Sequence, residues 1–320
     1  MSKWLKNILG VVILGALLWY LVSHWEQLKV LLKLSAVELF LMYFLWFLVM
    51  FNSAFVVQFL VKALGIKPDF WDMVRLNHTA ILLNYVPMKF GTLFRANYLK
   101  HHYGLPYAHF ATFFLYITFL TTATASAIGL IILAGIYGLD GYESKVLAGI
   151  FALTVIVSLL FLFIPLPLPR GQRRIIKLLR NFLSGRQQIS KEKKTVLLTS
   201  MLLALNFLLV ALRIGIIYHS MGKDIHFGGY LILGALGFVA LFIGLTPGSL
   251  GVRELVLSFG AVALGVPFEV GLLAAMVDRA VTISYSFVAG GCCAAWLWHK
   301  SPTDFKKTEA DSQEQKENSI

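Results

Sequence analysis

The sequence predicts an all-α integral membrane protein with six full spans and two re-entrant hairpins in an inverted repeat. Three observations favour this fold class. Of the 320 residues, 58% are hydrophobic and 14% charged, whereas soluble domains average roughly 45–50% apolar and 25% charged residues. Long stretches contain no Asp, Glu, Lys or Arg. Two other hydrophobic segments are interrupted by Pro, Gly and charges in a pattern that occurs twice.

The uninterrupted apolar stretches define the expected spans, because about 20 apolar residues cross a bilayer. These spans lie at 5–22, 39–61, 106–137, 146–165, 195–219 and 268–298. The first span follows Lys3 and Lys6, and no small-residue cleavage site ends it. We therefore expect a retained helix there rather than a signal peptide.

The two interrupted segments, 70–102 and 228–264, are expected to be re-entrant hairpins. Helix-breaking residues and charges at membrane depth are tolerated where the backbone is buried in protein or lines a wet cavity. The residues expected to break the helices are Pro87, Gly91, Pro247, Gly248 and Gly251.

Charge sets the expected orientation. Of the net charge of +12, residues 165–194 supply +8, with nine basic side chains and one acid, Glu192. The positive-inside rule places this loop, and both termini, in the cytoplasm. The hairpin at 70–102 then enters from the cytoplasm and the hairpin at 228–264 from outside. Anionic lipid is a second expected contact of the loop, and nucleic acid is not an expected partner.

Domain organisation is expected to be simple. Residues 1–299 form a single transmembrane domain, and the polar tail 300–320 is expected to be disordered and cytoplasmic. The two cysteines, Cys292 and Cys293, are adjacent, which suits neither a zinc site nor a disulfide framework. We expect no metal and no cofactor.

The two expected hairpins share a sequence motif. Pro87-Met-Lys-Phe-Gly91 is followed by Gly104-Leu-Pro-Tyr107, and Pro247-Gly-Ser-Leu-Gly251 by Gly265-Val-Pro-Phe268. The half-repeats cover about 5–137 and 146–298. Three crossings per half is an odd number, so the second copy must be inverted, as in many transporters whose substrates bind where broken helices meet. The alternative is an old duplication that serves only packing.

Ionisable side chains near the breaks are the candidate substrate-binding residues. A charge at the bilayer centre costs ~2.5–3.5 kcal/mol on insertion scales and is usually paired or faces a cavity. The candidates are Asn84, Lys89, Arg95, Arg253, Glu254, Asp278 and Arg279. Guanidinium groups bind phosphate in bidentate fashion, so an anionic lipid headgroup fits. The alternative for the last four is mutual neutralisation without ligand.

Two arginines are treated separately. No acid lies within 17 residues of Arg95, which favours a ligand there. Arg213 lies toward the outer end of its span, and we expect it to snorkel to the headgroups.

These motifs resemble a known family. The two P-x3-G breaks, with Arg95 after the first and Thr246-Pro-Gly-Ser-Leu-Gly-Val-Arg-Glu254 at the second, are similar to the flippase-like transmembrane region of bacterial lysylphosphatidylglycerol synthases (multiple peptide resistance factor) and to related stand-alone inner-membrane proteins. Met88 stands where the family pattern has a second glycine. The resemblance covers roughly 5–299.

The resemblance implies a flippase or scramblase that moves an anionic or lipid-linked headgroup across the bacterial inner membrane. The larger synthases also carry a soluble aminoacyl-transferase domain; the short segment after 299 leads us to expect no such enzyme activity here. Two alternatives remain open: an intramembrane lipid-modifying enzyme that uses Glu254 or Asp278 as a base, and a non-transporting partner of a synthase or glycosyltransferase. The residues do not distinguish an aminoacylated phospholipid from a polyprenyl-phosphate-linked sugar.

Overall fold

A computed structural model describes residues 23, 34–86, 90–164, 174–243 and 251–299, and the regular structure within those ranges is helical throughout. The elements are α3 (Ala36–Ala63), α4 (Phe70–Leu83), α5 (Phe90–Tyr103), α6 (Tyr107–Ile132), the π-helical turn η3 (Leu133–Tyr137), α7 (Tyr142–Phe163), α8 (Arg174–Lys191), α9 (Lys193–Ser220), α10 (Phe227–Ile243), α11 (Val252–Ala263) and α12 (Phe268–His299). The expected first span at 5–22 and the tail at 300–320 lie outside the described residues.

Five of these elements are long and apolar enough to cross a membrane: α3, α6 with η3, α7, α9 and α12. They coincide with five of the six expected spans, which makes the chain a multi-pass membrane protein. Local sequence sets where some helices begin. Ser35 and Glu38 form a reciprocal capping box at the start of α3, and the Asp69 side chain accepts a hydrogen bond from the Asp72 N–H at the start of α4.

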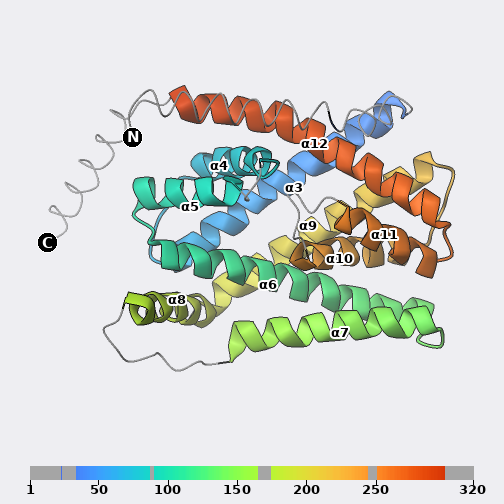
Figure 1. Cartoon of the computed structure of the whole chain (residues 1–320), viewed down its shortest axis with the longest axis horizontal. Helices are drawn as coiled ribbons and strands as arrows, with labels where there is room; N and C mark the ends of the chain where they lie inside the picture. The colour runs from blue at the N-terminus through green and yellow to red at the C-terminus, as the bar shows by residue number, and fades with distance from the viewer. Residues whose placement is uncertain (1–22, 24–33, 87–89, 165–173, 244–250, 300–320) are drawn as a thin grey trace, which may run out of the picture.

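Four further helices are shorter. α4 and α5 have 14 residues each, α10 has 17 and α11 has 12, all below the ~20 residues needed to span a bilayer. α4 packs on α5, and α10 packs on α11. The first pair lies at the end of the molecule where α6 begins, and the second lies at the opposite end, where α12 begins (Figure 1).

α3 and α9 share several features. α3 and α9 both have 28 residues and pack along one another. Each ends in a glycine with positive φ, Gly65 at 84° and Gly222 at 66°, and each turn is closed by the same hydrogen bond, Ile66 N to Val61 O in one and Lys223 N to Tyr218 O in the other. Glycine is favoured there because it alone adopts positive φ without strain.

The sequence predicted a loop for the basic segment 165–194. Much of this segment instead forms a helix, α8. This helix carries leucine and isoleucine on one side and charges on the other, the 3.6-residue pattern of an amphipathic helix. It packs against α6 (Figure 1). Residues 165–173 lie outside the described residues.

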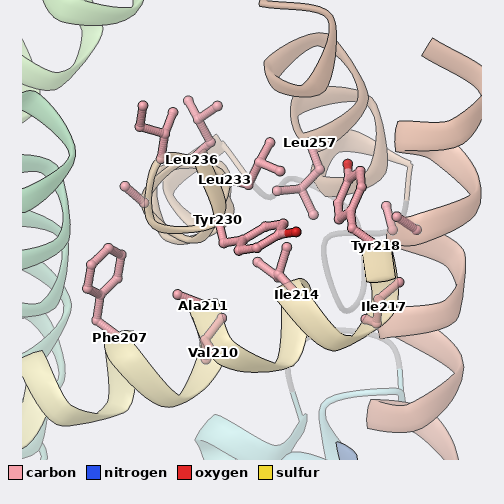
Figure 2. Close-up of a cluster of buried hydrophobic side chains, with 14 of the residues drawn as sticks. Phe207, Val210, Ala211, Ile214, Ile217, Tyr218, Tyr230, Leu233, Leu236 and Leu257 are labelled. Atoms are coloured by element: carbon pink, nitrogen blue, oxygen red, sulfur yellow. The ribbon is translucent and has the colours of Figure 1, made fainter. Parts of the chain in front are cut away.

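The core around the second short pair is apolar. From α9, Phe207, Ala211 and Ile214 face α10, and Tyr230 reaches from α10 to Ile214 (Figure 2). Gly215 permits this approach, since a methyl group there would lie 3.1 Å from the Tyr230 ring. This packed core positions the charged side chains described next.

Candidate functional site

Three helices bring opposite charges together inside the apolar core. Asp278 of α12 contacts Arg213 of α9 through Oδ1 at 2.6 Å and accepts a hydrogen bond from Arg253 Nη1 of α11 at 2.7 Å. Asp278 and Arg213 are both buried. A charge is tolerated at such depth only when it is paired, so this carboxylate holds the three helices in register.

A second pair joins α11 to α12. Arg279 Nε donates to Glu254 Oε1 at 2.6 Å, and Glu254 Oε2 accepts from the Gly251 N–H at 2.9 Å. The carboxylate thus caps the start of α11 while it binds the arginine of the next helix. We call the five residues Arg213, Arg253, Glu254, Asp278 and Arg279 the charge cluster. Each acid of the cluster is therefore paired with an arginine on another helix, and not with the arginine next to it in the sequence.

Arg213 corrects the sequence prediction. Its side chain is 1% exposed, so it is buried and does not snorkel. Its guanidinium carbon lies 4.3 Å from the centre of the Trp46 ring of α3, a cation–π contact. The apolar residues around Arg213 in the sequence gave no sign of this role, because its partner Asp278 is 65 positions away and only the folded chain brings them together.

The charge cluster is not fully satisfied. It contains three cations and two anions. Nε and Nη1 of Arg213 are buried and have no hydrogen-bond partner in the described part of the chain, and the contact of Nη2 with Asp278 lacks hydrogen-bond geometry. Arg253 is the most accessible of the three arginines, with 15% of its side chain exposed. Among the described residues, the five side chains of the cluster thus carry three positive and two negative formal charges.

Arg95 lies in a different environment, on the α4–α5 pair. Gly91, one turn earlier on α5, packs so tightly on α4 that a methyl group there would lie 1.8 Å from the Ala80 carbonyl oxygen and 2.6 Å from Asn84 Oδ1. Residues four apart share a helix face, so Arg95 lies on the α5 face that turns toward α4. Within the described residues Arg95 has no acidic partner, and its Nε is buried without a hydrogen bond.

Two asparagines belong to the α4 side of this helix pair, Asn77 within α4 and Asn84 at its C-terminal cap. Asn77 and Asn84 are seven residues apart and lie on one helix face. The Asn77 amide oxygen and nitrogen and the Asn84 amide oxygen are buried and have no hydrogen-bond partner among the described residues. We call Asn77, Asn84 and Arg95 the hairpin polar group. Asn77 was not among the residues predicted as a site, since a lone amide on a helix carries little signal.

Neighbouring contacts fix α12 on this helix pair. His78 is hydrogen-bonded through Nδ1 to the Val74 carbonyl and through Nε2 to the Tyr285 hydroxyl at 2.9 Å. Gly290 lets the backbones approach, because a methyl group there would lie 2.8 Å from the His78 carbonyl oxygen. These contacts pack α12 closely against α4.

The structure describes only some of the remaining residues that were predicted for the site and the helix breaks. Gly91 is the second residue of α5 and Gly251 immediately precedes α11, whereas Pro87, Lys89, Pro247 and Gly248 lie outside the described residues. Beside Asp278 there is a small, largely apolar cavity lined by Ile214, Leu233 and Ala274 among others. The described residues hold no group of three metal-ligating side chains.

Comparison with known proteins gives one finding. The family model described as the lysylphosphatidylglycerol synthase TM region matches residues 7–290. This range contains the charge cluster, the hairpin polar group, four of the five apolar spans and most of the fifth, α12. No curated protein and no solved structure matches the chain.

Proposed function

Because this chain belongs to the family of lysylphosphatidylglycerol synthase transmembrane regions, we propose that it moves lipid headgroups between the leaflets of the bacterial inner membrane. The cargo is an anionic or lipid-linked headgroup, and the lipid leaves chemically unchanged. Both termini of the chain lie on the cytoplasmic side.

The hairpin polar group carries this proposal. Within the part of the chain that the structure describes, it combines a guanidinium without an acidic partner, a buried unpaired Nε and two amides with unpaired atoms. Leaving such groups unsatisfied costs ~1–3 kcal/mol each, so they favour a polar occupant. A phosphate matches Arg95 by charge and Asn77 by its unpaired amide N–H donors.

The charge cluster takes a different role in this proposal. Its arginines contact Glu254 and Asp278, so they are less available to a headgroup than Arg95. We assign them the task of holding α9, α11 and α12 together. Their excess positive charge favours the approach of an anion without binding it permanently.

The architecture of the proposal is an inverted repeat. Its support is the correspondence of α3–α6 with α9–α12, the matched left-handed glycines, and the location of the two short helix pairs at opposite ends of the molecule (Figure 1). Transporters with inverted repeats bind their substrates near the midplane and alternate by rocking one repeat against the other. Here α4–α5 and α10–α11 are the re-entrant hairpins.

The test is lipid movement in reconstituted vesicles. Fluorescently labelled phosphatidylglycerol in the inner leaflet becomes accessible to dithionite when the protein moves it outward. We expect Arg95→Ala to slow this exposure roughly tenfold or more, the loss that follows from removing one charged hydrogen bond worth about 1.5–3 kcal/mol. Arg95→Lys should retain an intermediate rate, because it keeps the charge and loses the fork of donors.

A matched control is Lys145→Ala, which removes an exposed cation from the start of α7 and should leave the rate unchanged. Each variant must elute as one species and unfold at the wild-type temperature. Equal rates for wild type and Arg95→Ala would overturn the role of Arg95. A change in lipid mass, measured by mass spectrometry after incubation, would favour the lipid-modifying enzyme instead.

A further inference from the structure

Helix α8 is fixed to the bundle by its C-terminal half. Leu183 and Ile189 are buried, and Arg186, 2% exposed, donates to the carbonyls of Phe161 and Ile164 at the end of α7. A cation at the C-terminus of a helix is favourable because the last carbonyls carry partial negative charge. Arg186 thus links α8 to the C-terminal end of α7.

Two more contacts complete this docking. Thr112 Oγ1 of α6 donates to the Phe182 carbonyl at 2.8 Å, and Ser190 Oγ donates to the Leu162 carbonyl at 3.0 Å. Gly185 lies against His109 and Thr112, where a methyl group would come within 3.2 Å of both. The position of this half of α8 is therefore determined by protein contacts.

The N-terminal half is different. Leu178 and Leu179 are 52% and 48% exposed, and no described element covers them. Lys177, beside them in the sequence, is exposed, and so is Lys191 at the other end of the same polar face. Lys193 and Lys194 follow at the start of α9 and are exposed as well, with Glu192 as the acid among them.

The direction of α8 suits a membrane surface. In Figure 1 the spans α6 and α7 run along the picture plane, whereas α8 is foreshortened and so runs across them, at the end where α7 stops and α9 starts. A helix that crosses the spans at their ends lies along the bilayer interface. There, leucines enter the acyl region and lysines reach the phosphates.

We propose that α8 is an interfacial helix that binds the anionic lipid surface of the leaflet at this end of the molecule, with Leu178 and Leu179 of its N-terminal half inserted and Lys177 and Lys191, at its two ends, on the headgroups. The occupant is anionic lipid because the exposed charges of this face are mostly positive, and each Lys or Arg near an anionic surface contributes about fivefold in affinity. This site is separate from the hairpin polar group.

The experiment places a fluorophore on α8 of the full chain. In a Cys292→Ser/Cys293→Ser background, Leu178→Cys is labelled with an environment-sensitive dye and the protein is reconstituted into nanodiscs. The discs contain either brominated phosphatidylglycerol or brominated phosphatidylcholine at the same fraction. We expect a blue-shifted emission and stronger quenching by the anionic lipid, and a preference that weakens as salt is raised.

Charge reversal separates the proposal from simple burial in lipid. Lys177→Glu/Lys191→Glu should abolish the preference for the anionic lipid. The control Lys145→Glu/Lys223→Glu reverses two exposed lysines elsewhere and should preserve it. Equal quenching by the two lipids would overturn the proposal. So would a dye that stays in water and is quenched by neither, which would point to a protein partner on this face.

Discussion

Asp278 is the residue on which the second half of the bundle depends. It contacts Arg213 and Arg253 at once, so Asp278→Asn leaves two guanidinium groups without their anion. Arg253 is partly exposed and can turn to solvent, whereas Arg213 is buried. Breaking a buried pair costs about 3–5 kcal/mol. We expect the variant to lose this stability in detergent, measured as a fall in unfolding temperature.

Removing Arg213, the buried cation that Asp278→Asn leaves without its anion, tests whether this pairing explains the loss of stability. The double variant Arg213→Met/Asp278→Asn replaces the buried guanidinium with an apolar side chain and should recover a substantial part of the lost stability. Glu269→Gln, at an exposed position near the start of the same helix, serves as the control and should unfold as wild type. If the double variant were less stable than Asp278→Asn, the pairing of Arg213 would not be the reason.

At the scale of elements, the α4–α5 pair depends on one close approach. Gly91→Ala would drive a methyl group into the Ala80 carbonyl, 1.8 Å away, and backbone cannot yield as a side chain does. The helices must separate, which opens the hairpin polar group. We expect a lower unfolding temperature, with slower lipid movement than in wild type.

Gly149→Ala gives the matched control for that prediction. Gly149 lies in α7 with open space around the site of its absent methyl group, and alanine is the better helix former by about 1 kcal/mol. Unfolding temperature should be unchanged or raised. Similar losses in both variants would contradict the close-packing argument.

The helices also show which structural features can be predicted from the sequence. Five spans follow from hydropathy, since a run of about 20 apolar residues has few alternatives in a membrane protein. α8 was missed because the net charge of 165–194 hid the leucine and isoleucine periodicity inside it. Gly91 was predicted as a helix break and is also a packing contact, which no local pattern reveals.

For the candidate site too, some residues could be predicted from the sequence and others could not. Arg253, Glu254, Asp278 and Arg279 were singled out by the cost of charge in an apolar chain, and they are indeed assembled together. Their partners were not predictable: pairing joins residues 25 positions apart, on different helices. Arg213 depends even more on tertiary contacts, because the residues next to it in the sequence are apolar.

On the scale of the whole molecule, charge separates the two ends. Lys62, Lys67 and Lys100, at the ends of α3 and α5, lie at the same end of the molecule as α8, while the turn at 221–226 and the start of α7 lie at the other end (Figure 1). From the positive-inside rule we expect the α8 end to lie in the cytoplasm. We therefore expect the two short helix pairs to open toward opposite sides of the membrane.

This arrangement predicts opposite accessibility for two matched turns. Lys67 follows Gly65 and Lys223 follows Gly222, and both lysines are exposed. In the Cys292→Ser/Cys293→Ser background, Lys223→Cys should react with an impermeant maleimide in intact spheroplasts, whereas Lys67→Cys should react only after permeabilisation. A parallel repeat would put both turns on one side, because corresponding positions of parallel copies face the same way. Labelling of both cysteines, or of neither, in intact spheroplasts would therefore exclude the inverted repeat, while reaction of Lys67→Cys alone would keep the inversion and reverse the whole molecule.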